Sequence, residues 1–206
     1  DKVATNILKL QDAGIVALWR PFHEASGNML NSQGWTPTAW FWWGSKGGET
    51  YKKLWATMKN YFEERGIHNL IWIWTGTAKT ETNNSDESYY PGDDMVDIVG
   101  ADCYGSSVSE LKAQYDGLTK LYPTKMITLA ECGNLTSDNG SATVITKMMP
   151  TISEMWNAGA KFLYFMPWYD YYFEDGKADN SNMFSTDYWK DAMKMESVTM
   201  KNWGKK

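Results

Sequence analysis

Two glutamates occupy similar places in the sequence. Glu24 follows the apolar run "IVALW" (15–19), and Glu131 ends the run "KMITLAE" (125–131). Each is followed by a loop of small residues. Single glutamates at strand ends are usually only solvated, but two at the same end of one sheet could work as a pair. A protonated carboxyl group and an ionised one are the working parts of glycoside hydrolysis, so this chemistry is the first hypothesis.

Aromatic residues are the unusual feature of the composition. The 206 residues include 12 Trp, 12 Tyr and 7 Phe, and many of them stand in polar segments. Flat apolar faces beside hydrogen-bonding groups suit ligands that also combine an apolar face with polar groups, such as sugar rings. An aromatic-rich core would give the same count, so composition alone leaves both interpretations open.

The bulk properties exclude several classes of protein. A net charge of -5 argues against a nucleic-acid partner, which needs a basic face. Apolar runs stay far below the roughly 18 residues of a membrane span. Cys103, Cys132, His23 and His68 do not have metal-ligand spacing, so we expect no metal and no cofactor. We expect residues 1–206 to form a single domain with one core.

Hydrophobic spacing predicts alternating helices and strands. Helices are predicted at 1–13, 49–65, 109–121, 141–158 (kinked or divided at Pro150) and 186–195, and strands at 15–19, 69–74, 95–105, 125–133 and 160–168. Residues 75–94 are polar and are predicted to be a loop with at most a short helix. Continuous apolar strands are typical of a parallel sheet covered by helices, so the fold class is α/β.

Polar and aromatic residues follow the strands at their carboxyl ends. They are His23 and Glu24, Trp72 and Trp74, Asp102 and Tyr104, Glu131, and Trp168 and Tyr169. Parallel barrels and open α/β sheets both build their sites at this end of the strands. A glycine-rich phosphate loop follows none of these runs, which disfavours a nucleotide site.

Five segments together carry a family resemblance. The chain contains "RPFHE" (20–24), "AWFWWG" (39–44), "YYPGDDMVDIVGADCYG" (89–105), "LAECG" (129–133) and "FMPW" (165–168). In this order they resemble a glycoside hydrolase family 26 β-mannanase. The resemblance implies a (β/α)₈ barrel of about 250 residues, of which only strands four to eight are present here. The chain would then be the C-terminal part of a barrel without its N-terminal third.

The resemblance also implies a role for individual residues. Glu24 matches the general acid/base and Glu131 matches the nucleophile of a retaining reaction. The substrate-binding residues that it implies are His23, Trp40, Tyr104 and Trp168, with Tyr104 also placed to hydrogen-bond the nucleophile. For Trp42, Trp43 and Trp74 we favour simple packing.

The expected substrate is β-mannan, cleaved at internal β-1,4-mannosidic bonds without a cofactor. Relatives that cut xylan or mixed-linkage β-glucan remain an alternative, and so does a carbohydrate-binding fragment without catalysis. The family is mostly secreted, which implies a location outside the cytoplasm, either secreted, periplasmic or at the cell surface. We expect a monomer.

Overall fold

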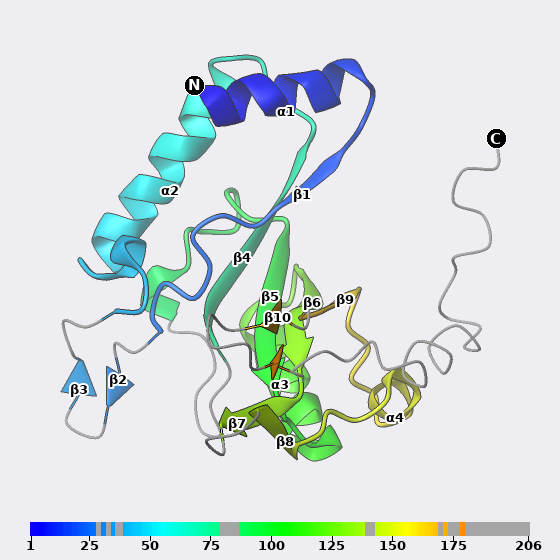
Figure 1. Cartoon of the computed structure of the whole chain (residues 1–206). Coiled ribbons are helices and arrows are strands. Elements are labelled where there is room, and N and C mark those ends of the chain that lie inside the picture. Colours follow the sequence, from blue (N-terminus) through cyan, green and yellow to red (C-terminus); the bar gives the residue numbers. More distant parts are fainter. Residues whose placement is uncertain are drawn as a thin grey trace. The chain divides into compact units, whose positions relative to one another are not determined.

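The computed structural model describes residues 1–27, 30–31, 34–35, 39–78, 87–138, 143–168, 171–172 and 178–179 (Figure 1). The chain forms two compact units. Unit 1 contains residues 1–101 and 118–128, and unit 2 contains residues 102–117 and 129–206. Each unit is described by itself below.

The elements of unit 1 are α1 (Lys2–Asp12), β1 (Ala17–Trp19), β2 (Leu30–Asn31), β3 (Gly34–Trp35), the 3₁₀ helix η1 (Trp42–Gly44), α2 (Gly48–Glu63), β4 (Leu70–Ala78) and the 3₁₀ helix η2 (Glu87–Tyr89). Of these, α1, β1, α2 and β4 correspond to predicted elements, whereas β2, β3 and η1 were not predicted. β5 (Ile98–Tyr104), α3 (Val108–Leu121) and β6 (Met126–Gly133) continue from one unit into the other. Unit 2 adds β7 (Leu135–Asp138), β8 (Thr143–Lys147), α4 (Ile152–Asn157), β9 (Phe165–Pro167), β10 (Tyr171–Tyr172) and β11 (Ala178–Asp179).

The principal sheet has the strand order β1-β4-β5-β6-β9. β1 pairs in parallel with β4, with Trp19 opposite Trp72, and β6 pairs in parallel with β9, with Leu129 opposite Phe165. The first six residues of β5 are all buried, which explains why its sequence does not alternate. The α/β prediction is confirmed, and each predicted strand overlaps an observed one.

The core of unit 1 is built from aromatic rings. Trp55 and Phe62 of α2 pack on Trp72 of β4 at centroid distances of 5.7 and 6.0 Å. The Trp55 indole N–H donates to the Met95 carbonyl across 3.3 Å. Part of the unusual aromatic content is therefore core, as one of the two interpretations expected.

The helix predicted over residues 141–158 is confirmed after Pro150 and wrong before it. Residues 143–147 form β8, which pairs antiparallel with β7, and α4 begins only at Ile152. The sequence "TVITK" is rich in β-branched residues, which favour a strand, and Pro150 lacks the N–H that a continuing helix needs. Thr151 then caps α4, accepting a bond from the Glu154 amide while Glu154 bonds back to the Thr151 amide.

Two smaller differences concern neighbouring segments. β4 extends to Ala78, four residues beyond its predicted end, and η2 is the short helix expected before residue 94. The helix predicted at 186–195 lies outside the described residues.

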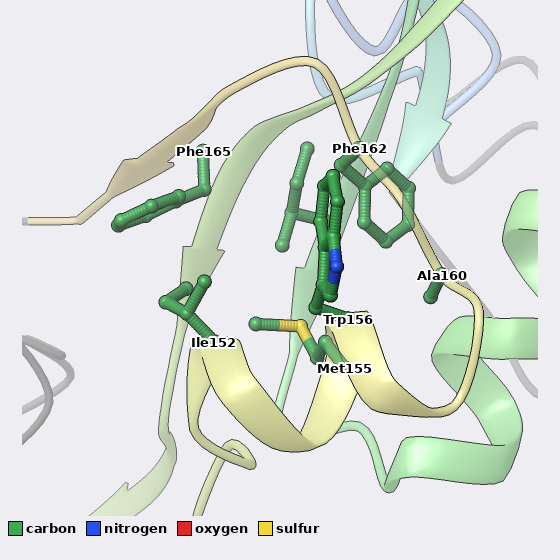
Figure 2. Close-up of a pocket in the computed structure, with 7 residues that line it drawn as sticks. Ile152, Met155, Trp156, Ala160, Phe162 and Phe165 are labelled. Atoms are coloured by element: carbon green, nitrogen blue, oxygen red, sulfur yellow. The ribbon is translucent and has the colours of Figure 1, made fainter. Parts of the chain in front are cut away.

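An apolar pocket in unit 2 lies beside α4 (Figure 2). Ile152, Met155 and Trp156 of α4 line it, together with Leu129, Ala160, Phe162 and Phe165. These side chains offer no carboxyl or hydroxyl group to a sugar. The pocket therefore belongs to the packing of α4 on β6 and β9.

Both cysteines are free and buried, as expected from their place in apolar strands. Burial is the main cause that raises the pKa of the Cys132 thiol well above its ordinary value, and Cys103 and Asp102 add to the rise. Cys132 therefore stays a thiol in the folded chain, and the thiolate that reacts with electrophiles is scarce. In the described part of the chain, no helix is long and apolar enough to span a bilayer.

The substitution Thr151→Ala should lower the free energy of unfolding by about 0.5–2 kcal/mol, because it removes the acceptor that caps α4. Thr151→Ser keeps the hydroxyl group and should stay close to the unmodified chain. Denaturant titration measures both variants. Equal stability of the two variants would show that the capping hydroxyl contributes nothing.

A second prediction concerns thiol labelling. In the native chain, Cys103 and Cys132 should react with a thiol reagent at about pH 8 at least tenfold more slowly than in denaturant, because both are buried. Absorbance of the released thiolate dye measures the rate. Rapid labelling of the native chain would contradict the burial of these strands.

Candidate active site

The loop that carries Glu24 has an unusual backbone. Phe22 and Glu24 have φ angles of 52° and 50°, the left-handed region that side chains with a Cβ rarely adopt. This conformation costs each residue about 1–2 kcal/mol. Strain of this kind persists only where the surroundings enforce it, and it is commonly found at functional sites.

Hydrogen bonds from three directions hold this backbone. The Tyr51 hydroxyl donates to the Phe22 carbonyl across 3.1 Å, and the Trp43 indole N–H donates to the His23 carbonyl across 2.8 Å. The Glu24 amide donates to the carbonyl of Thr75 on β4 across 3.0 Å. With about 0.5–1.5 kcal/mol from each bond, the three together are comparable to the strain.

Glycines allow the aromatic motif to lie directly on this loop. A Cβ on Gly44 would lie 1.7 Å from the Ala25 carbonyl oxygen, and a Cβ on Gly27 would lie 2.4 Å from Cε3 of Trp40. Trp40 is nevertheless 53% exposed, so it lies on the Gly27 backbone and remains accessible to a ligand. An exposed aromatic face beside a buried glutamate suits a sugar ring.

His23 and Glu24 differ in their exposure. Glu24 is 8% exposed, whereas His23 is half-buried, with its ring 4.7 Å from Phe41 and 5.8 Å from Trp43. Unit 1 thus brings together three of the predicted site residues, namely His23, Glu24 and Trp40.

Unit 2 holds the second glutamate. Glu131 is 5% exposed, and the Tyr104 hydroxyl donates to its Oε2 across 2.8 Å. The two residues lie on the adjacent strands β6 and β5. This bond joins two predicted site residues that are 27 positions apart in the sequence.

Asp102 is a further member of this group that the sequence analysis placed at a strand end without a role. Its side chain is fully buried, and one of its carboxylate oxygens lies within 4.8 Å of one from Glu131. The Asp-x-Tyr spacing of residues 102 and 104 was the available signal, since alternate residues of a strand share a face.

An irregularity in β6 determines the face of the strand on which the Glu131 side chain lies. Residues two apart on a regular strand share a face, yet Leu129 lines the apolar pocket while Glu131 reaches Tyr104. The pairing of β6 with β9 shifts register between Leu129 and Cys132. Such bulges turn a side chain to the other face of the strand, and they are common beside active sites.

Trp168 follows β9, next to the strand of Glu131. Its amide donates to the Cys132 carbonyl across 2.7 Å, and its side chain is half-buried. The backbone around Glu131 is therefore fixed to the start of the segment that carries Trp168.

The β7–β8 hairpin follows the strand of Glu131 and is held at its base. Asn134 accepts a bond from the Met149 amide, and the Met149 sulfur accepts one from the Ser106 amide. A Cβ on Gly105 would lie 2.5 Å from Cβ of Leu135, so the hairpin rests on the residue that follows Tyr104. These contacts fix the loops on both sides of the Tyr104–Glu131 pair.

Comparisons with known proteins agree with this arrangement. The chain is 32% identical to a mannan endo-1,4-beta-mannosidase of Thermothelomyces thermophilus, over 93% of this chain and 33% of that protein. It is 31% identical to a mannan endo-1,4-beta-mannosidase of Bacillus subtilis, over 82% of this chain and 43% of that protein. The chain thus spans about a third to under half of these relatives.

Solved structures give the fold. The GH26 domain of an endo-beta-mannanase/endo-beta-glucanase from Prevotella bryantii matches with a TM-score of 0.76 and 45% identity, over 95% of this chain and 54% of that domain. The parallel strands described above are thus part of a (β/α)₈ barrel. The family model of glycosyl hydrolase family 26 matches residues 1–195, nearly the whole sequence, and the chain belongs to this family.

Proposed function

We propose that this chain hydrolyses internal β-1,4-mannosidic bonds of β-mannan with retention of configuration. The observation that carries the proposal is the buried Glu131 carboxylate with the Tyr104 hydroxyl bonded to it, in a member of family 26. A hydrogen bond from a fixed hydroxyl orients one carboxylate oxygen and leaves the other for attack.

In the first step, Glu131 attacks the anomeric carbon while Glu24 gives its proton to the departing glycosidic oxygen. The glycosidic bond breaks, and a covalent glycosyl-enzyme forms. This step requires the two carboxyl groups to work about 5–5.5 Å apart. The enforced backbone of Glu24 and the register shift between Leu129 and Cys132 each restrain the backbone of one of these glutamates.

In the second step, water replaces the leaving group. Glu24 takes a proton from the water, the oxygen attacks the anomeric carbon, and the bond to Glu131 breaks. Both residues return to their starting states, so the cycle needs two carboxyl groups and water. The exposed face of Trp40, together with His23 and Trp168, would hold the sugars beside these groups.

The choice of mannan rests on the relatives, which are mannan endo-1,4-beta-mannosidases. The Prevotella bryantii protein is named an endo-beta-mannanase/endo-beta-glucanase, so β-glucan is the specific second candidate. We further propose that the chain acts as a monomer outside the cytoplasm, where polymeric mannan is found.

Reducing-sugar release from soluble β-mannan tests the proposal, with xylan and mixed-linkage β-glucan as other substrates. Glu131→Gln should abolish release because an amide cannot act as the nucleophile, and Glu24→Gln should lower it by about 10²–10⁴-fold. Glu64→Gln changes an exposed carboxyl group at the end of α2 and should keep full activity.

Release that survives Glu131→Gln would refute the assignment of the nucleophile. Binding of mannan without release by the folded, unmodified chain would favour a carbohydrate-binding function instead. Greater release from β-glucan than from mannan would favour the second substrate.

Tyr104→Phe tests the hydrogen bond to the nucleophile. Loss of a bond to a charged group costs about 1.5–3 kcal/mol, so kcat/KM on mannan should fall about ten- to a hundredfold. Tyr115→Phe is the control, because it keeps the ring that packs edge-on against Phe162. Equal kcat/KM for Tyr104→Phe and the unmodified chain would show that the bond does not support catalysis.

A further inference from the structure

We propose that Trp43 and Tyr51 are positioning residues for the acid/base step: their side-chain donors hold the backbone in which Phe22 and Glu24 are left-handed and which presents the Glu24 carboxyl group. The inference rests on the proposed function, in which Glu24 is the acid/base. It gives Trp43 a second role besides the packing that the sequence predicted for it.

The two donors engage consecutive carbonyl groups. Tyr51 bonds to the carbonyl of Phe22 at 3.1 Å, and Trp43 bonds to the carbonyl of His23 at 2.8 Å. These carbonyls belong to the two consecutive peptide units that precede Glu24. A rotation of φ at Glu24 to the usual negative range would turn the His23–Glu24 peptide and break both the Trp43 bond and the amide bond to Thr75.

Each donor is itself rigid. Tyr51 is completely buried on α2, and burial raises the pKa of its hydroxyl far above the usual range, so the group remains a donor. The Trp43 ring stacks on Phe41 with centroids 4.4 Å apart and planes 8° apart. A rotation of the indole would break this stacking, so the direction of its N–H is fixed.

The side chain of Phe22 completes the arrangement. Its ring lies 6.1 Å from the Trp43 ring and 6.4 Å from the Tyr51 ring. The same two residues that bond the backbone thus also contact the strained residue. Packing and hydrogen bonding thus restrain one short segment. Tyr51→Phe removes only the hydroxyl group, whereas Trp43→Phe removes the N–H and also reduces the ring that stacks on Phe41.

Amide exchange, read residue by residue by NMR, tests the restraint without any need for activity. In Trp43→Phe and Tyr51→Phe, exchange of the Glu24 amide should rise at least tenfold. Exchange of the Asp97 amide, which bonds to Trp72 on β4, should change less than about threefold. Tyr61→Phe is the matched control, since it removes a hydroxyl group of the same helix that donates to Asp1 and should leave the Glu24 amide unchanged.

Kinetics test the catalytic consequence. A misplaced acid should lower kcat on mannan about ten- to a hundredfold. With 2,4-dinitrophenyl β-mannobioside, whose leaving group needs no proton, formation of the glycosyl-enzyme should fall less than about threefold. A burst of dinitrophenolate should then precede slow turnover, and azide should restore turnover, because it attacks without a base.

The outcomes separate this inference from the proposed function. Unchanged Glu24 exchange in both variants overturns it, and so does an equal loss on mannan and on the aryl glycoside, since that would indicate a general effect on folding. If the unmodified chain cleaves no substrate, the proposed function fails, and exchange at Glu24 alone decides whether these donors hold the loop.

Discussion

The left-handed backbone of Phe22 and Glu24 is the constraint on which the surrounding structure depends. It points consecutive carbonyls away from the usual partners of a strand or helix, so side-chain donors must satisfy them. Trp43 and Tyr51 supply these donors from η1 and α2. The position of α2 is fixed in turn by the aromatic core on β4, so the core of unit 1 determines where the Glu24 backbone lies.

The second glutamate is positioned by a different device. Glu131 belongs to a buried strand whose regular alternation would turn it toward the side of Leu129. The register shift before Cys132 gives it the other face, where Tyr104 is the hydrogen-bond partner. A strained loop and an irregular strand thus have the same effect. Each fixes the direction of a carboxyl group that lies at the end of an apolar run.

Hydrophobic spacing was sufficient for the parallel strands, for α1 to α3 and for both buried glutamates, because these follow from burial along one short segment. It failed before Pro150, where the loose helical spacing of "TVITK" concealed a strand that depends on pairing with β7. It could not reveal the bulge or the angles of Phe22 and Glu24, since both depend on contacts between distant segments. Asp102 shows the same limit, because its nearness to Glu131 arises only when β5 and β6 pair.

The aromatic motif at 39–44 shows why residue type alone did not assign roles. Trp43 donates a hydrogen bond from a stacked ring. Trp40 instead lies on the Gly27 backbone and remains exposed to solvent. The Gly27 amide bonds to the Glu24 carbonyl, and the Trp40 amide bonds to the Gly27 carbonyl. In the proposed mechanism, a sugar that packs on Trp40 would contact a segment hydrogen-bonded to Glu24, the proposed acid/base. In that mechanism, substrate contact and the placement of the proton donor would be linked through Gly27, where a side chain would force the Trp40 ring away.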